Sequence, residues 1–188
     1  MCEDGAMRIG VLLTMGFLEA EAAPVLDAVR ILREAGAGIE AFTLAKSRHA
    51  LEGAAGTVWT AKYALSARPE LDVLVVPGSK GLARAARDLQ IELWLEEVWP
   101  RLEAVFLGAN GPVFLGELGR APQLVAAHPA YADEVKRYAK LGHETAYAVG
   151  KVTTTAGYLF LLGALLDHLQ SAEFDIEPVL EQMALAFD

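Results

Sequence analysis

One stretch near the middle of the chain has the pattern of a turn that presents a single residue for chemistry. It begins with Ala104–Leu107, a short apolar run typical of a buried parallel strand. The segment Gly108–Pro112 breaks this run, and an apolar-rich helix pattern follows to Gly119, with proline suited to its first turn. In such a nucleophile elbow, free backbone N–H groups and the positive end of the helix dipole point at the apex residue. Here the apex is Ala109, which has no reactive group.

Two carboxylates, Glu19 and Glu21, follow the first strand of the sequence. Pro24 fits only the first turn of a helix, so we expect the next helix to run from about Ala22 to Ala35. Both carboxylates should then lie in the preceding loop or at its mouth. From the sequence pattern alone, Glu21 is a solvated acid at a helix start, where the helix dipole favours negative charge.

Three other patterns carry weaker chemical signals. His143-Glu144 begins like the zinc motif HExxH, but the second histidine position is Tyr147, so no metal site is expected. Ser79 has no base beside it in the sequence and is not expected to act as a nucleophile. Lys80 is expected to be a solvated lysine.

Composition limits the class of protein. The 188 residues are 54% hydrophobic and 22% charged, which indicates an ordered globular protein with a large core. The net charge of −9 and the lack of a basic stripe argue against a nucleic-acid partner. The single cysteine, Cys2, excludes an intramolecular disulfide and fits a reducing cytoplasm. The acidic start predicts no signal peptide, and the longest apolar run, Ala156–Leu166, is too short to cross a bilayer.

Strand and helix patterns alternate along the chain, which predicts a doubly wound α/β fold with a mostly parallel sheet and helices on both faces. We expect residues 1–6 to be a disordered tail and residues 7–188 to form one domain. Residues 48–68 are ambiguous, and Val58–Tyr63 is either a strand or part of a small hairpin. The remaining expected strands are Met7–Thr14, Ile39–Leu44, Leu71–Val76, Gln123–Ala127, Glu144–Val149 and Lys151–Thr154, and the remaining helices fall within Leu82–Arg101, Tyr131–Lys140, Ala156–Leu169 and Ile176–Phe187.

A site in such a sheet lies where the parallel strands end. Three loops follow predicted strands at that edge: Gly16–Glu21, Pro77–Gly81 and Gly108–Pro112. We therefore expect these loops to meet.

Five short motifs in this order resemble the ThiJ/PfpI superfamily, whose members are relatives of class I glutamine amidotransferases. The resemblance extends over roughly Met7 to Leu169 and implies a flavodoxin-like fold. The motifs are Gly16-Phe17-Leu18-Glu19-Ala20-Glu21, Asp72-Val73-Leu74-Val75-Val76-Pro77-Gly78, Ala109-Asn110-Gly111-Pro112, Ala127-His128-Pro129 and Thr154-Thr155-Ala156-Gly157.

The resemblance implies roles for several residues. Glu21 matches the acidic site residue, and His128 matches a histidine that often lies beside the nucleophile. Backbone amides of Gly78, Ser79, Asn110 and Gly111 would bind a carbonyl or carboxylate. The superfamily's nucleophilic cysteine is replaced by Ala109, and the second glycine of its Pro-Gly-Gly turn is replaced by serine. The resemblance implies a homodimer, and it implies neither a cofactor nor a metal.

Two classes of function remain open. The first is a non-catalytic or regulatory small-molecule binder that has lost the nucleophile, and this is the one we favour. The second is a hydratase, glyoxalase, deglycase or hydrolase, either with cysteine at position 109 in the natural protein or with Glu21 as acid/base. His128 either lines the pocket or caps a neighbouring backbone group. If Ala109 is the apex, a cysteine placed there should have its thiolate stabilised by the helix terminus, more than an ionised Glu21 would destabilise it. A transcriptional regulator is disfavoured, because no helix-turn-helix module is present.

Overall fold

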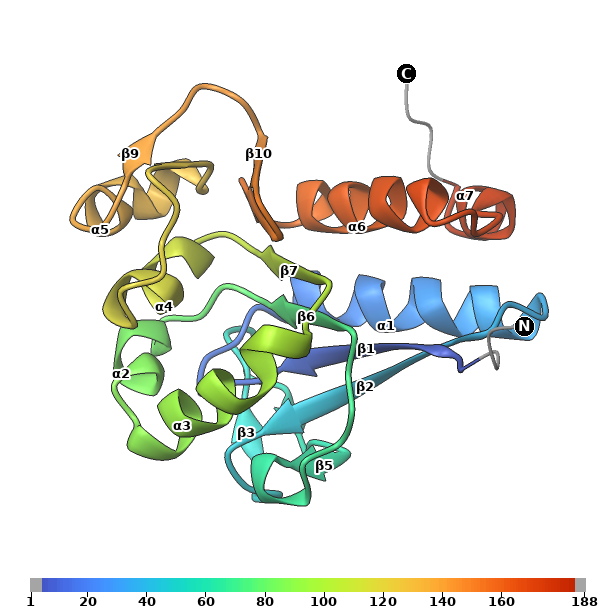
Figure 1. The fold of residues 1–188 in the computed structure, drawn as a ribbon, viewed down its shortest axis with the longest axis horizontal. Coiled ribbons are helices and arrows are strands. Elements are labelled where there is room, and N and C mark those ends of the chain that lie inside the picture. The colour runs from blue at the N-terminus through green and yellow to red at the C-terminus, as the bar shows by residue number, and fades with distance from the viewer. Residues whose placement is uncertain (1–4, 185–188) are drawn as a thin grey trace.

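Seven strands form the central sheet of the computed structural model, which describes residues 5–184 (Figure 1). All neighbouring strands are parallel except the β10–β11 hairpin. The predicted doubly wound, mostly parallel α/β fold is therefore confirmed. Of the tail expected over residues 1–6, the first four lie outside the described residues. In spatial order the strands are β10 (Ala146–Val149), β11 (Val152–Thr155), β7 (Ala104–Leu107), β6 (Val73–Val76), β1 (Met7–Leu12), β2 (Ile39–Ala45) and β5 (Tyr63–Ala64).

Helices cover both faces of this sheet. One face packs against α1 (Glu19–Glu34), α6 (Leu159–Ser171) and α7 (Glu177–Gln182). The other face packs against α2 (Leu82–Ala86), α3 (Leu89–Val98) and α4 (Gly111–Glu117). Within residues 5–184, no helix combines the length and the apolar character needed to cross a membrane.

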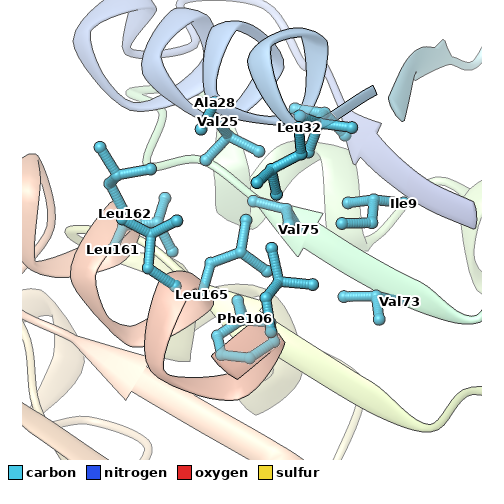
Figure 2. Close-up of a cluster of buried hydrophobic side chains, with 14 of the residues drawn as sticks. Ile9, Val25, Ala28, Leu32, Val73, Val75, Phe106, Leu161, Leu162 and Leu165 are labelled. Atoms are coloured by element: carbon cyan, nitrogen blue, oxygen red, sulfur yellow. The ribbon is translucent and has the colours of Figure 1, made fainter. Parts of the chain in front are cut away.

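The two helix layers explain why the central strands read as continuous apolar runs. In β6, Val73 and Val75 face the α1 and α6 side, whereas Leu74 and Val76 face the α2 and α3 side. A strand buried on both faces needs apolar residues at every position. Figure 2 shows the cluster on the α1 and α6 side, in which Val75 of β6 lies near the α1 side chains and Phe106 of β7 lies beside Leu165 of α6. The last helix packs into the same cluster through Ile176 and Val179, while Phe187, the end of the predicted helix, lies outside the described residues.

Two short two-stranded sheets accompany the main one. The antiparallel pair β3 (Leu51–Glu52) and β4 (Val58–Trp59) forms a hairpin, which was one of the two alternatives for this region. The parallel pair β8 (Leu124–Val125) and β9 (Lys140–Leu141) lies beside α4. The remaining short elements are the 3-10 turns η1 (Leu65–Ala67), η2 (Trp99–Arg101) and η3 (Pro129–Tyr131) and the helix α5 (Ala132–Val135).

The start of α1 differs from the prediction. The helix begins at Glu19 rather than near Ala22, so both carboxylates are helical and Pro24 lies inside the helix. The proline removes one helical hydrogen bond, whose acceptor would be the carbonyl of the exposed Ala20. The loss is tolerated because Ala20 is exposed and because both glutamates accept hydrogen bonds from other segments.

The helix predicted over Tyr131–Lys140 is also wrong over most of its length. Only η3 and α5 are helical, and the chain then turns so that β9 pairs with β8. The apolar spacing that suggested a helix is satisfied differently, because Val135, Tyr138 and Leu141 pack on Val113 and Val125. A hydrogen bond from Lys140 N to the Gln123 carbonyl holds the strand in place.

Candidate functional site

The loops expected to meet at the carboxyl edge of the sheet do so between β1 and β6. The chain proceeds from β1 to β2 on one side and then crosses to β6 on the other side, so this is the point where the strand order reverses. Ligand sites in open α/β sheets form at such a point. An isolated bridge between Phe17 and Ser79 joins the first two loops there, and Gly108 N donates to Val76 O to bring in the third.

Glu21 lies at the centre of this region and is 1% exposed. Its Oε2 accepts hydrogen bonds from Gly78 N at 2.7 Å and Ala109 N at 3.4 Å. Its Oε1 accepts from Tyr158 N at 2.8 Å and Ala109 N at 3.1 Å. One carboxylate of α1 therefore ties down the turns after β6, β7 and β11. Both of its oxygens are occupied by backbone donors.

Two glycines allow the backbone to come this close to Glu21, and a third makes room for Ala109. A Cβ atom on Gly108 would overlap Glu21 Oε2, and one on Gly157 would overlap Oε1. A Cβ atom on Gly78 would lie 2.9 Å from Ala109 Cβ. The residues around the carboxylate must therefore be small, which gives a physical reason for the glycine-rich motifs in the sequence.

Ala109 occupies the apex of the strand–turn–helix formed by β7 and α4, and it is fully buried. A Cβ atom built on Gly78 would lie 2.9 Å from Ala109 Cβ, 3.0 Å from Leu18 Cδ1 and 3.1 Å from Asn110 Oδ1, so these three side chains surround the space above this glycine. Ala109 is not one of the non-glycine residues with a positive φ in the described part of the chain. The apex thus has neither a reactive group nor a strained backbone.

The side chain of Asn110 occupies the backbone N–H of Ser79, one of the donors that the resemblance assigned to ligand binding. Its Oδ1 accepts from Ser79 N at 2.9 Å, and its Nδ2 donates to Ser79 O at 2.8 Å and to Glu134 Oε2 at 3.3 Å. Gly111 N donates to Gly108 O at 2.8 Å. Of the four expected pocket donors, those of Gly78, Ser79 and Gly111 are therefore paired within the protein. For Asn110 N–H, no acceptor is found in the part of the chain that the structure describes.

His128 lies directly beside the apex, and its backbone N–H donates to Ala109 O at 3.0 Å. Its Nδ1 accepts from Ala130 N at 3.2 Å, so the ring also caps the following turn. The imidazole ring centre lies 6.1 Å from that of Tyr131 and 5.3 Å from that of Tyr158. Burial raises the pKa of Tyr131, and the nearby phenol of Tyr158 and carboxylates of Glu21 and Glu134 add to this effect. A half-buried aromatic cluster therefore borders the site.

Tyr158 is a site residue that sequence reasoning missed. Its backbone has φ 52° and ψ −124°, a region that costs a non-glycine residue about 1–3 kcal/mol. Its N–H reaches Glu21 from this conformation, while its side chain is 41% exposed. The only sequence signal is its place directly after Gly157, in the turn that enters α6.

Other candidates from the sequence have structural partners. The Ser79 hydroxyl donates to Met15 O at 2.7 Å and accepts from Gly81 N at 3.0 Å, and Lys80 is exposed. The His143 and Glu144 N–H groups donate to the Tyr147 hydroxyl, so this tyrosine organises the turn that resembled a zinc motif.

Glu19 serves the neighbouring hairpin rather than the site. Its carboxylate accepts hydrogen bonds from Ala55 N at 3.0 and 3.1 Å and from the Thr57 hydroxyl at 2.8 Å. Partial burial opposes ionisation, but these hydrogen bonds outweigh it and lower the pKa of Glu19. Across residues 5–184, no group of three or more acidic, histidine or cysteine side chains is arranged to hold a metal ion.

Several solved structures share this fold. Drosophila melanogaster DJ-1beta has a TM-score of 0.82 and 17% identity, covering 97% of this chain and 100% of that chain. A cysteine-to-alanine mutant of a DJ-1 superfamily protein from Salmonella typhimurium has a TM-score of 0.78 and 21% identity, covering 96% and 100%. A ThiJ/PfpI family protein from Pseudomonas syringae has a TM-score of 0.78 and 20% identity, covering 98% and 77%. No protein-family pattern and no curated protein sequence matches the chain. The chain therefore has the fold of DJ-1/ThiJ/PfpI proteins.

Proposed function

We propose that this protein belongs to the ThiJ/PfpI superfamily and has lost covalent catalysis. It binds a small molecule in a non-catalytic or regulatory role. The observation that supports the proposal is a fully buried alanine at the apex of the β7–α4 turn, the position that the resemblance assigns to the nucleophile. Without a thiol, hydroxyl or amine at that point, no covalent intermediate can form. The lone cysteine and the absence of a basic stripe favour a cytoplasmic protein that does not bind nucleic acid.

The surroundings of Glu21 favour a structural role over acid–base catalysis. A general acid or base must come within hydrogen-bonding distance of the proton that it transfers. Glu21 is 1% exposed, and the hydrogen bonds to its two oxygens come from the backbone of the protein itself. A substrate would have to displace Gly78, Ala109 or Tyr158 to reach it.

A carbonyl or carboxylate group is the ligand chemistry that these residues would accept at the elbow. Asn110 N–H is one available donor, and Ser79 N–H becomes a second when the Asn110 side chain moves aside. His128, Tyr131 and Tyr158 would supply an aromatic border.

The proposal predicts that the purified protein turns over no glyoxal, isocyanide, amide or peptide substrate above the uncatalysed background. Product formation should be measured with each substrate class, and circular dichroism should verify that the protein is folded. Turnover that disappears in Glu21→Gln, scaled to the folded fraction of the variant, would instead establish Glu21 as an acid/base and refute the binder.

We also infer a homodimer, from the superfamily resemblance and from the high apolar content of 54%. Multi-angle light scattering at micromolar concentration should give about twice the chain mass of 20.1 kDa. A single species at the monomer mass would exclude a stable dimer at that concentration.

A further inference from the structure

The helix layer formed by α1 and α6 has an apolar outer surface next to the elbow. The two helices pack side by side on one face of the sheet (Figure 1). Their first turns meet at the elbow, where Tyr158 N donates to Glu21 Oε1. Directly after this contact, Leu159 and Phe160 are 59% and 50% exposed. Two large apolar side chains therefore project into solvent at the start of α6.

Charged side chains do not interrupt this surface at the starts of the two helices. On α1 the exposed positions there are Ala20 and Ala23, whereas Glu19 turns to the β3–β4 hairpin and Glu21 to the elbow. In α6 the first charged residue is Asp167, two turns after the helix begins. In a chain that is 22% charged, an exposed apolar surface without charge is typical of an interface. We call the following exposed residues the α1–α6 face: Ala20, Ala23, Leu159 and Phe160.

A shallow hollow of about 530 Å³ adjoins the α1–α6 face. Its lining is mostly apolar and comes from α1, the β3–β4 hairpin and the residue that follows α7: Ala23, Pro24, Leu26, Trp59 and Met183. The two charged residues of the lining, Asp27 and Arg30, are paired with each other at 2.7 Å. The same side of the molecule therefore has both an apolar projection and a hollow without net charge.

A second copy of the chain is the occupant that fits this surface. A two-fold axis brings the same patch of two copies together, so the projection of each can meet the hollow of the other. Each copy has a net charge of −9, which favours association through a face that carries no unpaired charge.

The exposed leucines on the opposite face of the sheet do not meet this condition. Leu89 and Leu93 of α3 are 65% and 55% exposed. Each is followed three positions later by a glutamate, Glu92 or Glu96, on the same side of the helix. A two-fold contact there would bring like charges together, which opposes association.

We infer that two copies of this chain associate through the α1–α6 face. Leu159 and Phe160 of each copy pack against α1 and the adjoining hollow of the other. This inference rests on the homodimer proposed above and names the surface through which it forms. Because Tyr158 directly precedes this face and its ring lies beside that of His128, association also covers one side of the candidate site.

Sedimentation equilibrium of wild type and Leu159→Glu tests this assignment. We expect wild type to be dimeric at micromolar concentration and Leu159→Glu to raise the dimer dissociation constant by at least about 100-fold, because a two-fold interface contains the introduced charge twice. Circular dichroism should show that the variant is folded, since a carboxylate in the first turn of α6 is favoured by the helix dipole.

Ala23→Lys is the second variant, and it changes the interface from the α1 side. It introduces a long charged side chain at the edge of the hollow and should also raise the dissociation constant by at least about 100-fold. A lysine at this position lies one turn before Asp27, an i,i+4 pair that favours the helix, so we expect this variant to fold.

Leu93→Glu is the matched control. It makes the same substitution as Leu159→Glu at a leucine of similar exposure, but on the helix layer that covers the other face of the sheet. We expect it to leave the dissociation constant unchanged.

Three outcomes would overturn the assignment. If wild type is dimeric and either Leu159→Glu or Ala23→Lys associates as tightly as wild type, the α1–α6 face is not the interface, although the homodimer stands. If Leu93→Glu weakens the dimer as much as Leu159→Glu does, the effect is not specific to this face and the assignment fails. If wild type is monomeric at about 100 μM, the homodimer and its interface both fail, while the proposed binding of a small molecule is unaffected.

Discussion

Glu21→Ala should lower the free energy of unfolding by about 3 kcal/mol or more, because it leaves two buried backbone N–H groups and one partly buried one without their acceptor. These donors belong to Gly78, Ala109 and Tyr158, which lie in three different turns. Each buried group left unsatisfied costs about 1–3 kcal/mol, although relaxation and water entry recover part of the sum. Urea denaturation followed by circular dichroism measures the change.

Glu21→Gln tests the same hydrogen bonds with almost no change in side-chain volume. The glutamine side chain keeps one acceptor oxygen but turns an NH₂ group toward at least one backbone donor, so it should still be strongly destabilising. Glu19→Gln is the matched control, since Glu19 lies in the same first turn of α1 and accepts hydrogen bonds from the exposed Ala55 and Thr57. We expect its effect to be less than about 1 kcal/mol.

The sign of the Glu21→Gln effect also separates a structural carboxylate from a catalytic one. Residues kept for chemistry often reduce stability, so replacing them tends to stabilise the protein. A Glu21→Gln variant more stable than wild type would therefore contradict the structural role. Equal losses in Glu21→Gln and Glu19→Gln would mean that the three backbone contacts contribute nothing specific.

The sheet and the meeting of its three loops could be predicted because local patterns determine them. Runs such as Ala104–Leu107 are apolar at every position, which is typical of a parallel strand covered on both faces. The order of strands and helices then restricts the topology, and the topology determines which strand ends meet. Glu21 and Ala109 could therefore be assigned to one region before any contact was known, whereas His128 was placed there only by the resemblance.

The errors arose where tertiary contacts outweighed local preference. Pro24 alone argues for a later start of α1, but hydrogen bonds to Glu19 and Glu21 from distant segments compensate for the lost helical bond. The spacing of Val135 and Tyr138 fits a helix, yet both side chains reach the core from a short helix and a turn.

The pairing of the elbow's backbone donors with the protein's own groups could not be predicted from the sequence either. It depends on where the Asn110 amide points, and Ser79, which it contacts, is 31 residues away in the chain. The motif predicts that backbone donors gather at the apex, but not that the protein's own side chains occupy them. The same applies to Tyr158, whose backbone conformation follows from its contact with Glu21 rather than from its residue type.

The burial and hydrogen bonds of the elbow argue against the stabilised thiolate expected for a cysteine at the apex. Position 109 is fully buried, and the Glu21 carboxylate accepts a hydrogen bond from its backbone N–H. Burial and a nearby negative charge both raise the pKa of a thiol. Of the donors that would stabilise a thiolate, Ser79 N–H and Gly111 N–H already have acceptors, and only Asn110 N–H remains among the described residues. The thiol introduced by Ala109→Cys should therefore be protonated and shielded.

Alkylation with iodoacetamide at pH 6 measures this directly, in a Cys2→Ser background so that each chain carries one thiol. The thiol at position 109 should react at least about tenfold more slowly than glutathione, since it must await local opening of the elbow. Adding Asn110→Ala should increase its rate by about tenfold or more, because this change frees Ser79 N–H for the thiolate. Gln123→Ala, an exposed substitution outside the elbow, should leave the rate unchanged. A thiol that outpaces glutathione without the Asn110 substitution would mean that the elbow opens readily and that its amides remain available to ligands.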